Sequence, residues 1–231
     1  MLHLDWASCH EFEETSQPEW LSLAEQLQLL ALGSPRRKGD WLVGRLTAKR
    51  VLQQFFRDHG YPLLQRKEIE IFSVNGAPLV HVNGKRMHEI SLSIAHSHEH
   101  ALAGMAQITT EGRIGVDLER IRTVHCRLAS RVLTSREREA LRHVPPEVQH
   151  EELILYWVLK EATIKAIKPL LGNLCMNQLE VEIDKHKRRA GILFSRGSEK
   201  MIVEAQYEKK HGFFSAYALV PPESMALISS R

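Results

Sequence analysis

The sequence has few cysteines, no long apolar run and only a small excess of charge. Its three cysteines, Cys9, Cys126 and Cys175, are odd in number and far apart, which excludes a disulfide-rich secreted scaffold and a closely spaced zinc site. No apolar stretch approaches the roughly 18 residues of a membrane span. The N-terminus lacks a basic segment followed by an apolar one, so we expect no signal peptide. These absences predict a cytoplasmic protein.

The remaining composition is that of an ordinary folded protein. Hydrophobic residues make up 43% and charged residues 26%, which argues against disorder. A chain of 231 residues can bury a sizeable core, as one large domain or two smaller ones. The net charge of +3 is too small to indicate nucleic-acid binding, but it favours an acidic partner. We expect a monomer that binds neither nucleic acid nor membrane.

The stretch Glu152 to Lys168 predicts a long helix with two faces. Trp157, Glu161 and Lys165 follow one another at i, i+4 steps beside the apolar face. A carboxylate and an ammonium at the edge of a buried face suit catalysis, yet the same spacing also makes an ordinary ion pair worth about 0.2–0.5 kcal/mol. The face that a core would bury contains Leu155, Val158, Leu159, Ala162 and Ala166.

A second segment, Arg113 to Arg120, alternates apolar with polar or small residues and predicts a half-buried strand. Side chains two apart on a strand share a face, so Asp117 and Glu119 are expected on the same side. Two neighbouring carboxylates repel each other unless a cation neutralises them, and Mg²⁺ is a common solution. Glu161, on the helix, is a candidate third oxygen ligand.

Together these segments resemble the two signature motifs of the 4′-phosphopantetheinyl transferases of the Sfp type. The family pattern is a Gly-x-Asp-x-Glu strand followed by a Trp-x-x-Lys-Glu-x-x-x-Lys helix. The short Asp-x-Glu pattern alone is weak, whereas both motifs in this order and at this separation are specific. Trp157 is either a packing residue or a contact. The fixed positions are filled here by Gly115, Asp117, Glu119, Trp157, Lys160, Glu161 and Lys165.

The resemblance implies an α+β fold of two similar subdomains related by a pseudo-twofold. Each would contain a small, mostly antiparallel sheet and a long helix, with the active site in the cleft between them. The predicted boundaries are 1–110 and 111–231. The patterns fit this layout, because strands are predicted within 68–94 and again after residue 179, and each half offers a long helix.

The implied activity is transfer of the 4′-phosphopantetheine arm of coenzyme A to a serine of an apo carrier protein, with release of 3′,5′-ADP. Mg²⁺ would lie among Asp117, Glu119 and Glu161, and Asp117 would also contact coenzyme A. Glu161 would accept the proton of the serine. Lys165 would stabilise the departing phosphate, and Lys160 would bind phosphate.

The segment after Arg36 and Arg37 predicts a basic helix that Gly60 and Pro62 end. If the helix includes Lys38, then Lys38, Arg45 and Lys49 lie near one side of it. Such a basic run is often a solvated face, but arginine and lysine also suit phosphate recognition. In the resembling family, basic residues here contact the phosphates of coenzyme A. The match assigns this role to Arg45 in the helix, and to Arg36 and Arg37, which precede the helix.

Three histidines alternate in the segment that follows the predicted sheet. If the chain is extended there, His96, His98 and His100 share one face, which could suggest a metal site. No fourth ligand is visible, so exposed histidines are the more ordinary interpretation of His98 and His100. His96-Ser97 resembles a Ser-His-Ser segment of the family, with Ala95 in place of the first serine. The resemblance implies that His96 and Ser97 contact coenzyme A.

This chain lacks one lysine that the family pattern contains. The family usually has Gly-Lys-Pro at the first turn of this sheet, with the lysine near coenzyme A, and this chain has Ala77 instead. Lys85 and Arg86 are candidate replacements.

Two other functions compete with this interpretation. One is a different Mg²⁺-dependent nucleotidyl or phosphodiester-type enzyme. The other is a basic binding module without catalysis, in which Asp117 and Glu119 are ordinary surface charges.

Overall fold

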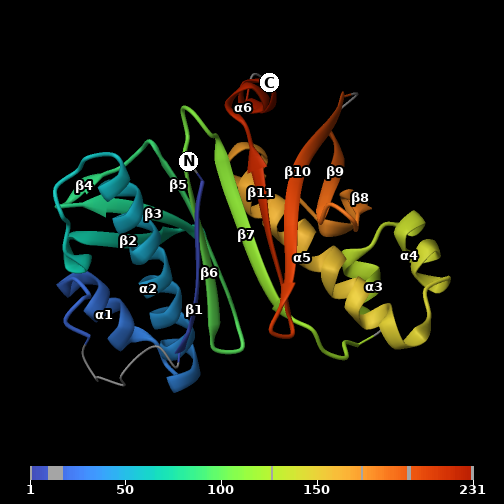
Figure 1. Cartoon of the computed structure of the whole chain (residues 1–231), viewed down its shortest axis with the longest axis horizontal. Coiled ribbons are helices and arrows are strands. Elements are labelled where there is room, and N and C mark those ends of the chain that lie inside the picture. Colours follow the sequence, from blue (N-terminus) through green and yellow to red (C-terminus); the bar gives the residue numbers. More distant parts are fainter. Residues whose placement is uncertain (1, 10–17, 126, 173, 197–198, 230–231) are drawn as a thin grey trace. The chain divides into compact units, whose positions relative to one another are not determined.

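The computed structural model describes residues 2–9, 18–125, 127–172, 174–196 and 199–229, so Cys126 lies outside it. The chain divides into two compact units, Met1–Glu111 and Gly112–Arg231. Each unit combines helices with antiparallel sheets, which confirms the predicted α+β class (Figure 1). The pseudo-twofold and the placement of the site stay predictions.

The N-terminal unit contains a long helix, α2, and two three-stranded sheets of order β1-β6-β5 and β2-β3-β4. Helix α2 begins after Ser34, whose hydroxyl accepts a hydrogen bond from the N–H of Arg37, and it ends before Gly60, which has φ 73°. Its apolar face packs against strands of both sheets. The elements are β1 (His3–Ser8), α1 (Leu23–Ala31), α2 (Pro35–Asp58), η2 (Arg66–Glu68), β2 (Ile69–Val74), β3 (Ala77–Val82), β4 (Lys85–Arg86), β5 (Ile90–Ser97) and β6 (His100–Gln107).

The C-terminal unit is one antiparallel sheet of order β7-β11-β10-β9-β8 with the long helix α5 packed against it. Helix α5 extends beyond the predicted range at both ends, and the predicted apolar face is buried throughout. The elements are β7 (Arg113–Arg120), α3 (Arg127–Val132), α4 (Ser135–Arg142), α5 (Pro146–Leu171), η3 (Met176–Gln178), β8 (Glu180–Asp184), β9 (Arg189–Arg196), β10 (Glu199–Lys210), β11 (Phe213–Val220) and α6 (Pro222–Ser229).

Strand β7 is buried on both faces over most of its length, so the prediction of a half-buried strand is wrong. Ile114, Val116 and Leu118 are at most 2% exposed. On the other face, a Cβ atom at Gly115 would lie 1.9 Å from the carbonyl oxygen of Ala162, which shows that α5 covers this face. The alternation concealed this second buried face because glycine and a carboxylate occupy it in place of apolar residues.

The two units repeat one order of elements. Each begins with a strand, continues through a short helix, a long helix and a 3-10 turn, and then forms its remaining strands. In each, the last strand pairs antiparallel with the first: β6 with β1, and β11 with β7. The C-terminal unit adds α3 and α6.

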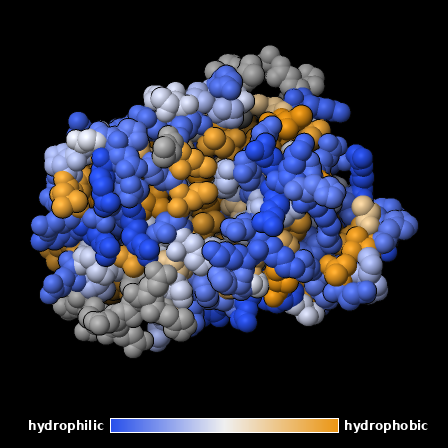
Figure 2. Space-filling view, viewed as in Figure 1, coloured by the Kyte–Doolittle hydropathy of each residue, from blue (hydrophilic) through white to orange (hydrophobic). Residues whose placement is uncertain are grey.

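The surface is mixed in character. Polar and charged side chains cover most of the face shown in Figure 2, with apolar side chains visible between them. Leu23, Leu27 and Leu30 on α1 are among the exposed large apolar residues. In the part of the chain that the structure describes, no helix is long and apolar enough to cross a membrane.

Candidate active site

The contact between β7 and α5 brings both predicted motifs together. Lys165 Nζ lies 2.6 Å from Asp117 Oδ1, so this ion pair joins the helix to the strand instead of lying within the helix. Asp117 is 5% exposed. Its second oxygen, Oδ2, is buried and has no hydrogen-bond partner among the described residues. One carboxylate therefore holds the lysine and retains a buried oxygen that a further positive group would satisfy.

Gly115 makes this approach possible. Besides the contact with Ala162, a Cβ atom at this position would lie 2.5 Å from the backbone nitrogen of Ala166. Only a residue without a side chain lets the helix backbone come so close to the strand. Asp117 lies two residues further on the same face, so the glycine sets the distance between its carboxylate and α5.

Glu161 is half-buried on α5, one turn before Lys165. Burial raises the pKa of its carboxyl above the ordinary value, and the negative charge of Asp117 adds to this, while Lys165 and Lys168 act in the opposite direction. A carboxyl with a raised pKa is a better proton acceptor than an ordinary surface glutamate.

The predicted metal set is only partly brought together. Among the residues that the structure describes, no three His, Cys, Asp or Glu side chains converge on a point where a metal could bind. Glu119 is half-buried further along β7, where it pairs with Phe214 in the sheet register. Asp117 and Glu161 nevertheless fit a cation, because Asp117 has an unpartnered buried oxygen and the pKa of Glu161 is raised by burial and, to a smaller extent, by the charge of Asp117.

The raised pKa of Glu161 predicts a pH-dependent effect on stability. Because the folded pKa exceeds the unfolded one, ionised Glu161 costs folding free energy above the folded pKa, and this cost disappears as the pH falls below the unfolded pKa. Without divalent cations, Glu161→Gln should therefore raise the melting temperature at about pH 8 and leave it unchanged at about pH 3.5. A difference of the same size at both pH values would contradict the assignment.

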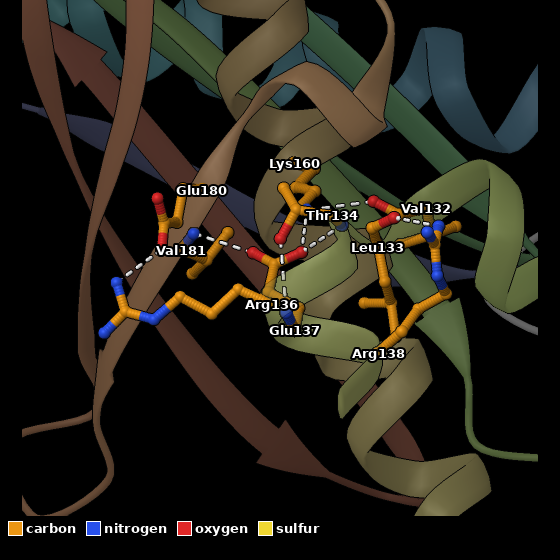
Figure 3. A network of polar contacts seen from close by, with 9 residues as sticks. All are labelled: Val132, Leu133, Thr134, Arg136, Glu137, Arg138, Lys160, Glu180 and Val181. Atoms are coloured by element: carbon orange, nitrogen blue, oxygen red, sulfur yellow. Dashed lines mark hydrogen bonds and ion pairs between the residues drawn. The ribbon is translucent and has the colours of Figure 1, made fainter. Parts of the chain in front are cut away.

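Lys160 occupies a different environment from the predicted one. Its side chain is fully buried, forms an ion pair with Glu137 and donates a hydrogen bond of 2.9 Å to the carbonyl of Val132 (Figure 3). An ammonium held in this way inside the unit is not available to a phosphate, so we leave Lys160 out of the proposed site. Trp157 is partly buried against the core, which supports its packing role.

The N-terminal unit contains a pocket of about 390 Å³ that gathers three of the predicted coenzyme A ligands. A larger hollow of about 870 Å³ beside α1 contains none of them. The 390 Å³ pocket is also lined by apolar side chains and by one carboxylate, that of Asp40. It is lined by Leu32, Arg37, Asp40, Trp41, Gly44, Arg45, Ser73, Gly76, Pro78, Ile94 and His96.

Arg45 is the best-defined charge in this pocket. It is only 7% exposed, and its guanidinium lies 4.8 Å from the ring centroid of Trp41. Burial lowers its pKa to about 10, which leaves it protonated at neutral pH. Its Nε is buried without a hydrogen-bond partner in the described structure, so an anion in the pocket would satisfy it. The alternative of a solvated basic face does not hold here, since Lys49 is fully buried too.

Two other predicted ligands lie outside the pocket lining. The side chain of Arg36 is 80% exposed and lies 4.0 Å from Asp40. Ser97 is buried, and its hydroxyl lies 3.0 Å from Nδ1 of His98. Because neighbouring strand residues face opposite ways, Ser97 points away from the side that His96 presents. The structure therefore supports Arg37, Arg45 and His96 as one group, without Arg36 and Ser97.

The three histidines do not share a face. His98 and Glu99 form a two-residue turn with φ values of 49° and 65°, and the hairpin pairs Ser97 with His100. The condition for a shared face, an extended segment, is therefore not met. The sequence did not mark this turn, because such turns usually contain Asn-Gly or Asp-Gly and no glycine occurs here.

Strand β4 does not replace the lysine missing at Ala77. Lys85 pairs with Val82 at the end of β3, whereas Gly76 and Pro78, at its beginning, line the pocket. The strand rises about 3.3 Å per residue, so roughly 13 Å of strand separates the two ends.

Sequence reasoning missed Asp40 and Trp41 as pocket residues. The signal was present, because Trp41 precedes Arg45 by one helical turn, a spacing at which an aromatic ring and a cation stack.

Comparison with known proteins supports the site formed by Asp117, Glu161 and Lys165. Residues 113–219 match the family model of the 4′-phosphopantetheinyl transferase superfamily. This span is a little less than half of the chain and contains β7, α5 and the Asp117–Lys165 pair. The C-terminal unit therefore contains the sequence pattern of this superfamily, which is one of transferase enzymes. No curated protein sequence matches the chain.

Solved structures show a partial likeness. An apo-ACPS from Chronobacterium ammoiniagenes is 19% identical, with a TM-score of 0.38 over 46% of this chain and 93% of that one. A holo-ACP-synthase from Plasmodium yoelii is 17% identical, with a TM-score of 0.36 over 46% and 91%. A holo-(acyl-carrier-protein) synthase from Bacillus anthracis in complex with CoA (3′,5′-ADP) is 21% identical, with a TM-score of 0.37 over 46% and 92%. The superfamily pattern in residues 113–219 therefore depends on the family match alone and not on these structures.

Proposed function

We propose that the protein is an Sfp-type enzyme that transfers the 4′-phosphopantetheine arm of coenzyme A to a serine hydroxyl of an apo carrier protein. The observation that carries this proposal is the 2.6 Å ion pair between Lys165 and Asp117, beside Glu161 with its raised pKa. These residues occupy the two motifs that the superfamily match spans.

The chemistry assigns one role to each side chain. Glu161 accepts the serine proton as the serine oxygen forms a bond to the β-phosphorus of coenzyme A. The bond from that phosphorus to the bridging oxygen breaks, and 3′,5′-ADP leaves with the electron pair. Lys165, oriented by Asp117, stabilises the charge on the leaving phosphate. Asp117, Glu119 and Glu161 would hold Mg²⁺, which when bound neutralises the pyrophosphate.

The pocket of the N-terminal unit is proposed for the nucleotide end of coenzyme A. Arg45, Arg37 and His96 supply donors for phosphate, and the buried, unpartnered Nε of Arg45 supports an anionic ligand. Trp41 offers an aromatic surface beside them. The net charge of +3 suits an acidic carrier, and we propose that the enzyme acts as a cytoplasmic monomer.

Substitution of Arg45 should weaken coenzyme A binding more than it slows the reaction. Arg45→Met keeps the stem against Trp41 and removes the guanidinium, so KM for coenzyme A should rise about tenfold while kcat changes little. Arg36→Met, which removes an exposed arginine outside the pocket, is the matched control. Equal KM values for both variants in steady-state kinetics would argue against the pocket assignment.

Product analysis separates the proposal from its two competitors. The protein is incubated with coenzyme A and Mg²⁺, with or without a panel of apo carrier proteins, and the nucleotides are resolved by chromatography. The proposal expects 3′,5′-ADP only when an apo carrier is present. Carrier-independent 3′,5′-ADP would indicate a phosphodiester-type hydrolase, and unchanged coenzyme A with every carrier would favour a binding module.

A further inference from the structure

Each unit contains one fully enclosed glutamate–lysine pair in the same structural setting. The pairs are Glu25 with Lys49 and Glu137 with Lys160, and all four side chains are at most 4% exposed. In both, the glutamate comes from a short helix and the lysine from the long helix that follows it. Burial lowers the pKa of both lysines, and the partner glutamate opposes this shift.

The Glu137–Lys160 pair connects four segments (Figure 3). One oxygen accepts the N–H of Val181 in β8 at 2.8 Å, and the other accepts the N–H of Thr134 at 2.8 Å and the ammonium of Lys160. Thr134 caps α4 in return by accepting the N–H of Glu137. Lys160 also donates to the carbonyl of Val132 at the end of α3. Helix α5 is thereby fastened to α3, α4 and β8.

Glu25 has the corresponding contacts in the other unit. One oxygen accepts the N–H of Ile71 in β2 at 3.1 Å, and the other accepts the N–H of Ser22, the residue that caps α1, and the ammonium of Lys49. Lys49 also donates to the carbonyl of Arg66 at 2.8 Å. Helix α2 is thereby fastened to α1, η2 and β2.

General stability does not explain why such a pair is built twice. Taking two charges out of water costs folding free energy, and a well-packed apolar pair of similar size often does as well. What the pairs add is a fixed axial and rotational position for each long helix. Lys160 is adjacent to Glu161, and Lys49 lies one turn after Arg45. Each pair therefore sits beside one residue of the proposed site.

We infer that the two buried pairs are positioning devices. The Glu137–Lys160 pair holds α5 so that Glu161 and Lys165 are presented to Asp117, and the Glu25–Lys49 pair holds α2 so that Arg45 enters its pocket. Lys160 is thus a positioning residue instead of a phosphate ligand. The kinetic part of this inference rests on the proposed function, and the structural part does not.

The kinetic test uses double variants, because a single substitution would leave one charge buried and unpaired. Glu137→Gln/Lys160→Met should lower kcat about tenfold or more with little change in KM for coenzyme A, since small displacements of catalytic groups are costly. Glu25→Gln/Lys49→Met should raise that KM about fivefold or more with little change in kcat. Each variant controls for the other, because the two changes are chemically identical.

Kinetics are measured well below both melting temperatures and normalised to folded protein. Wild-type kinetics in both variants, or parallel losses of kcat and affinity in both, would overturn the inference, because a merely structural role predicts no such split. Absence of phosphopantetheine transfer by the wild-type enzyme would instead refute the proposed function.

The structural part of the inference is tested by unfolding measurements that need no activity assay. A double-mutant cycle with Asp117→Asn and Lys165→Met measures the coupling of that ion pair in urea unfolding. The coupling should fall by about half or more in the Glu137→Gln/Lys160→Met background and persist in the Glu25→Gln/Lys49→Met background. Undiminished coupling in the first background would overturn the inference whatever the enzyme's activity.

Discussion

Glu161→Gln should lower kcat about 10²-fold or more, the usual range for loss of a general acid–base group. The substitution keeps the shape of the side chain and removes its charge and basicity. Lys165→Met should also lower kcat, by about 10²-fold, because the ammonium acts on charge that develops as 3′,5′-ADP leaves. If the helix carried only an ordinary ion pair, either change would cost about 0.2–0.5 kcal/mol of stability and leave the reaction rate unaltered.

Both variants are assayed at saturating coenzyme A, carrier and Mg²⁺, with melting curves recorded in parallel. Lys168→Met is the matched control, because it removes an exposed lysine from the same helix, one turn further on. Near-normal kcat in both Glu161→Gln and Lys165→Met would refute the catalytic role of α5.

Gly115→Ala should destabilise the C-terminal unit by about 3 kcal/mol and reduce activity sharply. The new Cβ would lie 1.9 Å from the carbonyl oxygen of Ala162, and a helix backbone cannot yield as a flexible side chain does. Helix α5 must therefore move away from β7. The contact of 2.6 Å between Lys165 and Asp117 should lengthen with it, and the catalytic geometry would be lost.

Gly191→Ala in β9 provides the control for Gly115→Ala. A Cβ there would lie 3.7 Å from Cγ2 of Ile202, an ordinary contact, so a neutral or slightly stabilising effect is expected. Urea unfolding and kcat are measured for both variants. Equal stability of the two would show that the approach of α5 to β7 does not depend on the glycine.

Local patterns predicted the elements well and the surroundings of charged residues poorly. The apolar spacing within α5 was sufficient to predict that helix, and the glycine after α2 was sufficient to predict where α2 ends. Both predictions succeed because helix formation and termination depend on nearby residues. The burial of Lys160 was not predictable in the same way. Its partner Glu137 lies 23 residues away in the sequence, and nothing in the helix pattern indicates that α4 folds over it.

In the candidate site, too, local motifs identified residues, whereas their contacts depend on tertiary packing. The two motifs identified Asp117, Glu161 and Lys165, and the structure brings these three side chains together. The sequence predicted an ion pair of Lys165 with Glu161 in the same helix as the ordinary alternative, because their i, i+4 spacing allows it. The pairing of Lys165 with Asp117 depends instead on tertiary packing through Gly115. The pocket around Arg45 likewise depends on where β2, β3 and β5 bring Ser73, Pro78 and Ile94.

The central claim is tested most directly by the intact mass of an apo carrier protein after incubation with the enzyme, coenzyme A and Mg²⁺. The account predicts that the carrier gains the mass of one 4′-phosphopantetheine group. The gain should be absent when the acceptor serine of the carrier is replaced by alanine, and strongly reduced with the Asp117→Asn enzyme. A panel of apo carriers that all keep their original mass, with folded wild-type enzyme and intact coenzyme A present, would contradict the account.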